Sequence, residues 1–266
     1  MVKPNVLVLT GYGINCDEET QYAFEKAGAK ANIVHINDII DRKKKIGDYQ
    51  IFMLPGGFSY GDDLRAGVAL ANRIRNNLWE ELREFIAQDK LVLGICNGFQ
   101  VLTNLGLLPA LNEKYGSRQA ALLHNTSARY IDRWVDIRFE NSGPWTTGIR
   151  TMRAPIAHGE GRFYSEPVAL RRLNEKNMIC ARYVYGEMCE HFSLPANPNG
   201  SIEDIAGITD ESQRILGLMP HPERAIDFTH LPNWTLIKET YRRKGRELPL
   251  EGDGLQLFKN GVRYFS

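Results

Sequence analysis

The sequence predicts an α/β protein built on an open, mostly parallel sheet with helices on both faces. Short apolar runs typical of buried strands cover residues 6–10, 32–36, 51–54 and 91–93. Between them, as in residues 17–27 and 64–85, apolar side chains recur every three or four positions, as on one face of a helix. This alternation favours strand–helix–strand units. At 266 residues the chain is within the size range of one α/β domain, so we expect a single domain over 1–266.

The second half departs from that alternation. Residues 122–129, 134–139, 154–157 and 178–185 resemble strands without full helices between them, which predicts an added, partly antiparallel section. A hairpin is expected from residues 205–209 and 215–219. The tail divides into a polar, basic segment over 231–249, expected to be a mobile or partner-facing insertion, and a terminal helix over 254–265 that closes the core.

Composition narrows the class of protein. Hydrophobic residues at 43% and charged residues at 24% are ordinary for a globular protein, and a net charge of +1 gives no indication of a nucleic acid or an anionic membrane as partner. The four cysteines contain no C-x-x-C pair, so a zinc ribbon or redox dithiol is not expected. Cys180 and Cys189 could pair, although reduced thiols are favoured. The N-terminal apolar run is too short for a signal peptide, and no stretch approaches the ~18 apolar residues of a membrane span. We therefore expect a cytoplasmic protein.

The segment that organises the chain is KLVLGICNGFQVLTNLGLLP, residues 90–109. Cys96 follows an apolar strand and precedes a helical pattern, with a glycine two residues to each side. This is the G-x-nucleophile-x-G elbow with cysteine in place of serine. Glycines suit such a crowded turn, and the unpaired N–H groups of a helix start favour a thiolate. The competing interpretation is a buried structural cysteine, but the strand before and the helix after favour catalysis.

A second candidate loop, PGGFSYGD, follows the strand at 51–54. Ligands of open parallel sheets bind beyond the carboxyl ends of the strands, and this loop and the Cys96 elbow would meet at that edge. We hypothesise that backbone N–H groups near Gly57 and of Asn97 receive an oxyanion. A plain strand-to-helix turn is the alternative. Gly11, Gly13 and the residues up to Cys16 match a dinucleotide fingerprint only in part, and a glycine turn explains them better.

Two further polar segments complete the candidate site. The sequence PHPER places His221 and Glu223 two residues apart after an apolar run, so that in extended backbone both side chains point to one face. A histidine beside a carboxylate is the base and orienting half of a Cys-His-acid triad, although a surface ion pair is also common. Residues 157–163, AHGEGRF, are expected to form a loop that lines the site, with a surface turn as the alternative.

The set GGFSYGDDLRAG, GICNGFQ, AHGEGRF and LGLMPHPER resembles the class I, triad-type glutamine amidotransferases. Within that class it is most similar to the glutaminase subunits of phosphoribosylformylglycinamidine synthase, in motif order and over most of the chain. The elbow and PHPE are shared by many amidotransferases, whereas GGFSYGD-x-LR, AHGEGR and MPHPER indicate the purine enzyme. One departure is the first loop, GYGIN, where many relatives have a shorter proline–glycine turn.

The resemblance implies a reaction and a division of labour. Cys96 would be the nucleophile that forms a γ-glutamyl thioester, His221 the general acid and base, Glu223 its orienting partner, and Gly57 and Asn97 the oxyanion hole. Four further residues are expected to contact glutamine: Phe58, Gln100, His158 and Glu160. Ammonia would pass to a large synthetase subunit, with a small third subunit often bridging the two. No cofactor is expected in this chain, which lacks a G-x-x-x-x-G-K-[ST] loop, and ATP and Mg are expected on the synthetase.

Other readings stay open from the sequence. The chain could serve a different synthetase, or it could be a peptidase-like relative of the same fold, although such relatives usually lack a late PHPE. It could also be a catalytically silent protein that only binds a partner or glutamine. An intact set of Cys96, His221 and Glu223 argues against a silent site.

Overall fold

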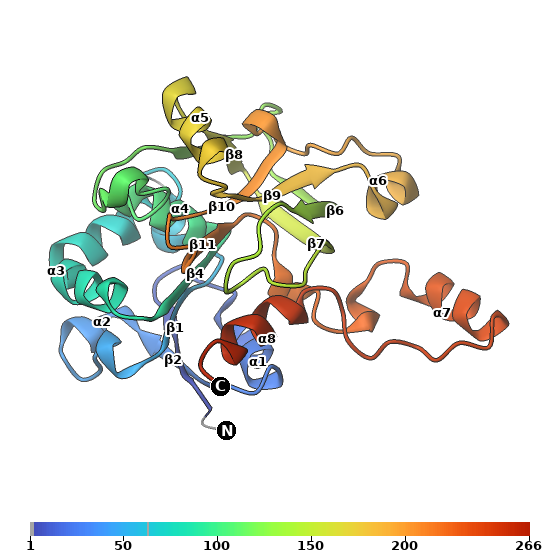
Figure 1. Ribbon diagram of the computed structural model, residues 1–266, viewed down its shortest axis with the longest axis horizontal. Coiled ribbons are helices and arrows are strands. Elements are labelled where there is room, and N and C mark those ends of the chain that lie inside the picture. The colour runs from blue at the N-terminus through green and yellow to red at the C-terminus, as the bar shows by residue number, and fades with distance from the viewer. Residues whose placement is uncertain (1–2, 63) are drawn as a thin grey trace.

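A computed structural model describes residues 3–62 and 64–266. Its main sheet has nine strands in the spatial order β2-β1-β3-β4-β11-β10-β9-β6-β7 (Figure 1). The bounds of these strands are β1 Asn5–Thr10, β2 Lys30–His35, β3 Ile51–Leu54, β4 Leu91–Ile95, β6 Ile131–Phe139, β7 Thr151–His158, β9 Ile179–Val184, β10 Ile205–Thr209 and β11 Ile215–Leu218. Two shorter strands, β5 (Ala121–His124) and β8 (Glu160–Tyr164), pair separately. The predicted α/β class with an open sheet is confirmed.

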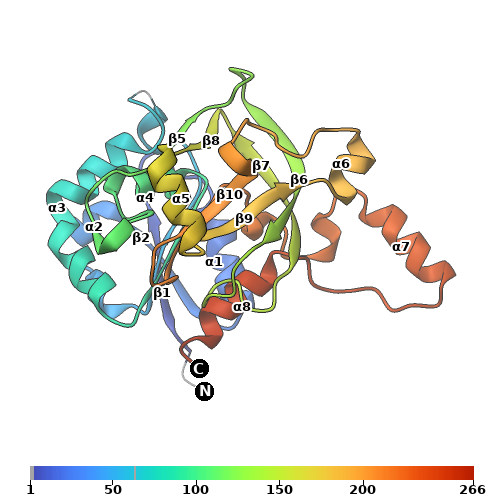
Figure 2. The same cartoon turned by 45° about the horizontal axis from the view of Figure 1, so that its top comes forward.

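The half of the sheet from β2 to β11 is parallel, as the alternation of strands and helices predicts. Helices α3 (Val68–Ala87) and α4 (Asn97–Leu105) lie on one face, whereas α1 (Asp17–Lys26) and α8 (Leu255–Arg263) lie on the other (Figures 1 and 2). The short α2 (Ile36–Ile40) packs beside α3. The expected terminal helix is therefore present, and its Phe258 packs edge-to-face on Phe24 of α1, with ring centroids 4.9 Å apart.

The other half of the sheet is antiparallel from β11 through to β7, which confirms the added antiparallel section. The hairpin of β10 and β11 joins the two halves. Two helices in this section were not expected, α5 (Pro167–Glu175) and α6 (Glu187–Phe192). The loop expected over 157–163 was also wrong: β7 runs through His158 and β8 starts at Glu160, so only Gly159 lies between two strands.

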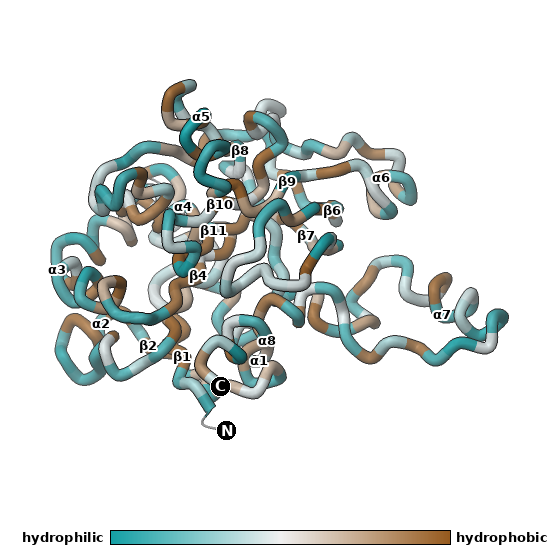
Figure 3. The backbone as a smooth tube through the Cα atoms, in the orientation of Figure 1, coloured by the Kyte–Doolittle hydropathy of each residue, from teal (hydrophilic) through white to brown (hydrophobic). Residues whose placement is uncertain are grey.

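The core follows the strands of the main sheet. Strands β3, β4, β10 and β11 are buried at every position, because helices or strands cover both of their faces. The hydropathy colouring shows this as apolar segments through the centre and polar colour on the outer turns (Figure 3). Among the described residues, no helix combines the length and the apolar composition that crossing a membrane requires.

The segment expected as an insertion contains a helix, α7 (Trp234–Arg243), in an arm that extends away from the body in both views (Figures 1 and 2). No residue of α7 is fully buried, and Leu236 and Leu250 are 60% and 85% exposed. The arm therefore adds little to the core.

The cysteine elbow depends on a close approach between α4 and β3. A Cβ atom placed on Gly98 would lie 1.9 Å from the backbone oxygen of Leu54. The side chain of alanine cannot fit there unless the helix and the strand separate. We expect Gly98→Ala to lower the free energy of unfolding by about 3 kcal/mol or more, at the upper end of overpacking costs. Urea unfolding of the two proteins measures this, and an unchanged midpoint would contradict the packing described here.

Candidate active site

Cys96 lies at the sharp turn between β4 and α4. Its backbone angles, φ 49° and ψ −105°, are strained for a residue with a side chain. Packing around the residue, which is 4% exposed, stabilises this strained conformation. A hydrogen bond of 2.8 Å from its backbone nitrogen to the backbone oxygen of Leu218 does so as well. The start of α4 presents unpaired N–H groups, whose partial positive charge favours an anion at this point.

The parallel pairing of β4 and β11 brings the histidine to the same edge. Leu218 of β11 lies beside Ile95, so the residues after each strand meet at the carboxyl end of the sheet. His221 is 1% exposed, and its backbone nitrogen donates to the oxygen of Pro155 at 2.8 Å. Its Nδ1 lies 2.6 Å from Oε1 of Glu223, which is equally buried. Because a carboxylate only accepts, Nδ1 carries the proton of this bond.

The opposite ring nitrogen of His221 is available for proton transfer. Within the described residues, Nε2 of His221 is buried and has no hydrogen-bond partner. Burial by itself would lower the pKa of His221, but the charges of Glu223 and Cys96 raise it well above its ordinary value. The imidazolium form that this favours is the form that can hand a proton to a leaving group.

A small cavity of about 80 Å³ collects these groups. Its lining includes the nucleophile candidate, the imidazole and the PGGF loop, and comprises Asn15, Cys16, Gly57, Phe58, Cys96, Tyr130, Ala157, His221 and Arg224. Glu223 lies behind the imidazole. Asn97, the other oxyanion candidate, begins α4 next to Cys96, and its side-chain oxygen accepts from the nitrogen of Ser59 at 3.3 Å. The elbow and the loop after β3 are thereby tied together.

Of the four residues expected to contact glutamine, only Phe58 lines this cavity. Gln100 does not line the cavity. Its Oε1 accepts from Nδ2 of Asn97 at 2.8 Å, and its Nε2 donates to the backbone oxygen of Glu160. His158 is 2% exposed and bonds to Asn125 at 3.1 Å, and burial lowers its pKa to about 3. Contact of Gln100, His158 and Glu160 with glutamine stays a prediction.

The sequence did not indicate Cys16, Tyr130 and Arg224, which also line the cavity. The signal for Cys16 was present, because its turn follows β1 and so reaches the same carboxyl edge. The first loop packs on the PGGF loop, with the nitrogen of Phe58 donating to the oxygen of Gly13 at 2.7 Å.

The Cys16 sulfur, Nδ1 of His221 and a Glu223 oxygen lie within 4.8 Å of one another, a grouping compatible with a metal. Arg224, however, donates to that sulfur at 3.0 Å, and its charge opposes a cation there.

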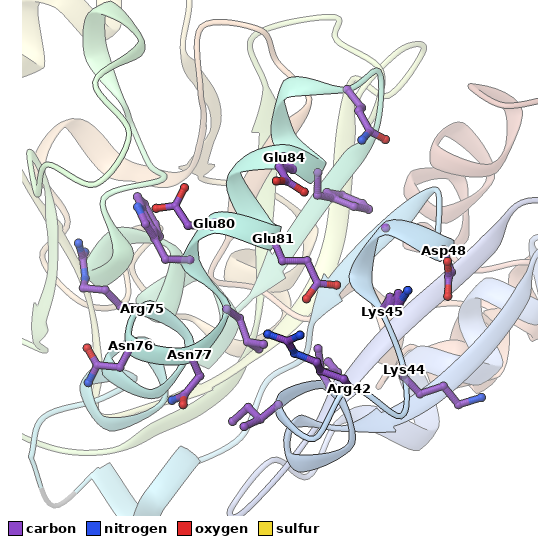
Figure 4. Close-up of a pocket in the computed structure, with 17 residues that line it drawn as sticks. Arg42, Lys44, Lys45, Asp48, Arg75, Asn76, Asn77, Glu80, Glu81 and Glu84 are labelled. Atoms are coloured by element: carbon purple, nitrogen blue, oxygen red, sulfur yellow. The ribbon is translucent and has the colours of Figure 1, made fainter.

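A larger cavity, of about 680 Å³, lies away from this chemistry (Figure 4). Its lining includes Arg42, Lys44 and Lys45 from the segment before β3, and Glu81 and Glu84 from α3. The segment 41–48 precedes β3, so this hollow lies at the amino ends of the strands, opposite the edge where α/β proteins bind ligands. The smaller cavity is the candidate active site because Cys96 and His221 line it, although the other cavity is larger.

The open α/β sheet, with Cys96, His221 and Glu223 gathered at its carboxyl edge, agrees with the class I glutamine amidotransferases that the motifs resemble. The family model described as CobB/CobQ-like glutamine amidotransferase domain matches residues 3–265. The chain belongs to this family and, within it, to the PurQ subunits of phosphoribosylformylglycinamidine synthase.

Three relatives carry this assignment. The PurQ subunit of Methanococcus maripaludis is 52% identical, over 100% of this chain and 98% of its own. That of Dehalococcoides mccartyi is 39% identical, over 99% of this chain and 98% of its own. A chain of the PurLQS structure from Thermotoga maritima is 32% identical with a TM-score of 0.72, and each chain is covered completely. This chain is accordingly a glutamine amidotransferase.

Proposed function

We propose that this chain hydrolyses glutamine at Cys96 and delivers the ammonia to a separate synthetase subunit. That subunit would use ATP and Mg²⁺ to convert formylglycinamide ribonucleotide to formylglycinamidine ribonucleotide in purine biosynthesis. A small third subunit would bridge the two. The observation that carries the proposal is the buried His221–Glu223 pair, 2.6 Å apart, in the cavity wall that also holds Cys96.

The proposed chemistry assigns a role to each group of the site. The sulfur of Cys96 attacks the side-chain amide carbon of glutamine, and the N–H groups of Gly57 and Asn97 receive the oxyanion. His221 gives its proton to the departing nitrogen, which leaves as ammonia while the γ-glutamyl thioester remains. His221 then takes a proton from water as it attacks the thioester, and glutamate is released. Glu223 keeps the imidazole in the tautomer that both steps need.

Two further parts of the proposal concern the chain as a whole. We propose that residues 1–266 form one domain, which is supported by a single main sheet whose strands run from Asn5 to Leu218 and by the packing of α8 on α1. The cytoplasm is the proposed compartment. All four cysteines are free thiols, which is the usual state of cysteines in a reducing compartment.

Reconstitution tests the division of labour. The isolated chain is expected to release glutamate from glutamine slowly, because the site is then not coupled to the liganded synthetase. Adding the synthetase subunit with its nucleotide ligands is expected to raise that rate by a factor on the order of 10 to 100, the usual size of coupling between sites. Glutamate release at saturating glutamine is the measurement. A rate that ignores the synthetase and its ligands would contradict the proposed partnership.

A further inference from the structure

The imidazole of His221 is confined on the edge that carries Cε1 and Nδ1. The sulfur of Cys16 lies 4.0 Å from Nδ1. On Gly56, a Cβ atom would lie 2.6 Å from Cε1 of His221 and 3.0 Å from the same sulfur. The ring edge therefore fits between a position that admits only glycine and a sulfur that is itself buried, with Cys16 1% exposed.

Arg224 holds that sulfur in place. Its Nη2 donates to Sγ of Cys16 at 3.0 Å, and its Nε donates to Oε1 of Glu19 at 3.0 Å. Cys16 and Glu19 belong to the start of α1, whereas Arg224 directly follows Glu223 in the short 3₁₀ turn η5 (Pro222–Arg224). One guanidinium thus joins the start of α1 to the segment that carries two members of the proposed triad.

We propose that Cys16, Glu19 and Arg224 act as a clamp that positions the His221 ring, so that Nδ1 faces Glu223 and Nε2 stays available to Cys96. These are positioning residues for the reaction, and the inference rests on the proposed function of the triad. Cys16 serves as a contact and not as a second nucleophile. Burial raises the pKa of its thiol, which keeps the sulfur protonated at neutral pH.

Within the clamp, Cys16 contacts the ring and Arg224 holds the sulfur of Cys16, so the test changes each of these two residues. Cys16→Ala removes the sulfur, and Arg224→Gln removes the cation that holds it, while Cys16→Ser and Arg224→Lys restore part of each. Turnover is measured in the complex with the synthetase, once with glutamine and once with ammonia as nitrogen source. We expect kcat with glutamine to fall about 10-fold to 100-fold in Cys16→Ala and Arg224→Gln, because a misplacement of about 1 Å can cost about 10²-fold.

The expected pattern has three more features. The KM for glutamine stays unchanged, the two conservative variants recover part of kcat, and the rate with ammonia is that of the parent complex. Lys26→Gln is the matched control, because the ion pair of Lys26 with Asp227 also joins α1 to the segment after η5 but does not touch His221. This control is expected to keep the full rate with glutamine.

A rise in KM with kcat preserved would make Arg224 a binding residue for the substrate carboxylate and would overturn the clamp. Full activity of both Cys16→Ala and Arg224→Gln would also overturn it, as would equal losses in Lys26→Gln or in the ammonia-dependent rate. Cys96→Ala distinguishes a failure of the proposed function from a failure of the clamp. If that variant still hydrolyses glutamine, the proposed function fails, whereas a dead Cys96→Ala beside fully active clamp variants refutes only the clamp.

Discussion

Replacing Cys96 by alanine should abolish glutamine-dependent synthesis while leaving the ammonia-dependent reaction of the complex intact. The thioester cannot form without the sulfur, and removing a nucleophile of this kind costs about 10⁶-fold in turnover. The ammonia-dependent reaction needs only the synthetase and correct docking. Alanine keeps the Cβ atom, so it meets the same φ of 49° that cysteine tolerates here, and the elbow should persist.

The matched control for this prediction is Cys180→Ala. Cys180 lies fully buried in β9, away from the cavity, and burial raises the pKa of its thiol. The control makes the same chemical change at a position that should not affect catalysis, so glutamine-dependent synthesis should continue. Ammonia release from glutamine by Cys96→Ala would show that another group is the nucleophile.

Replacing Glu223 by glutamine should produce the second-largest loss. The side chains have nearly the same shape, but the amide can donate its N–H to Nδ1 of His221 and so place the ring proton on Nε2. That nitrogen can then no longer accept a proton, and loss of the charge removes a main support for the raised pKa of His221. By analogy with other triads, we expect kcat to fall by about 10⁴-fold, with a smaller change in KM.

Steady-state glutaminase kinetics of Glu223→Gln measure this effect. Glu190→Gln, on the exposed side of α6, is the control for loss of one carboxylate, and it should behave as the parent protein. Turnover of Glu223→Gln within about a factor of ten of the parent would be far smaller than the cost of a mispositioned triad base. Glu223 would then be a structural ion-pair partner and not the orienting group.

The elbow could be predicted because its determinants are local. Gly94, Cys96 and Gly98 lie within five residues, between an apolar strand and a helical pattern, and the crowding that this motif implies is present at Gly98. For His221, the sequence predicted only that the residue follows the end of a strand. That β11 pairs with β4 and not with another strand is a long-range choice, which local patterns do not determine.

What could not be predicted has identifiable causes. Helix α5 has nine residues, of which only Leu173 is buried, and its apolar Val168 is 66% exposed. Its sequence therefore lacks the repeated apolar positions by which a helix is recognised. In residues 157–163 the two glycines suggested a loop, yet the pairing of β8 with β5 makes most of that segment strand. Arg224 and Cys16 are more than two hundred positions apart, and only the folded chain brings the guanidinium to the sulfur.

Covalent labelling tests most directly whether Cys96 is the activated thiol of this chain. The protein would be treated with a glutamine-like electrophile near neutral pH, digested, and analysed by mass spectrometry for modified cysteines. We expect modification of Cys96 and protection by added glutamine, with Cys16, Cys180 and Cys189 unmodified. Equal modification of all four thiols, or modification of Cys16 in preference to Cys96, would contradict this expectation.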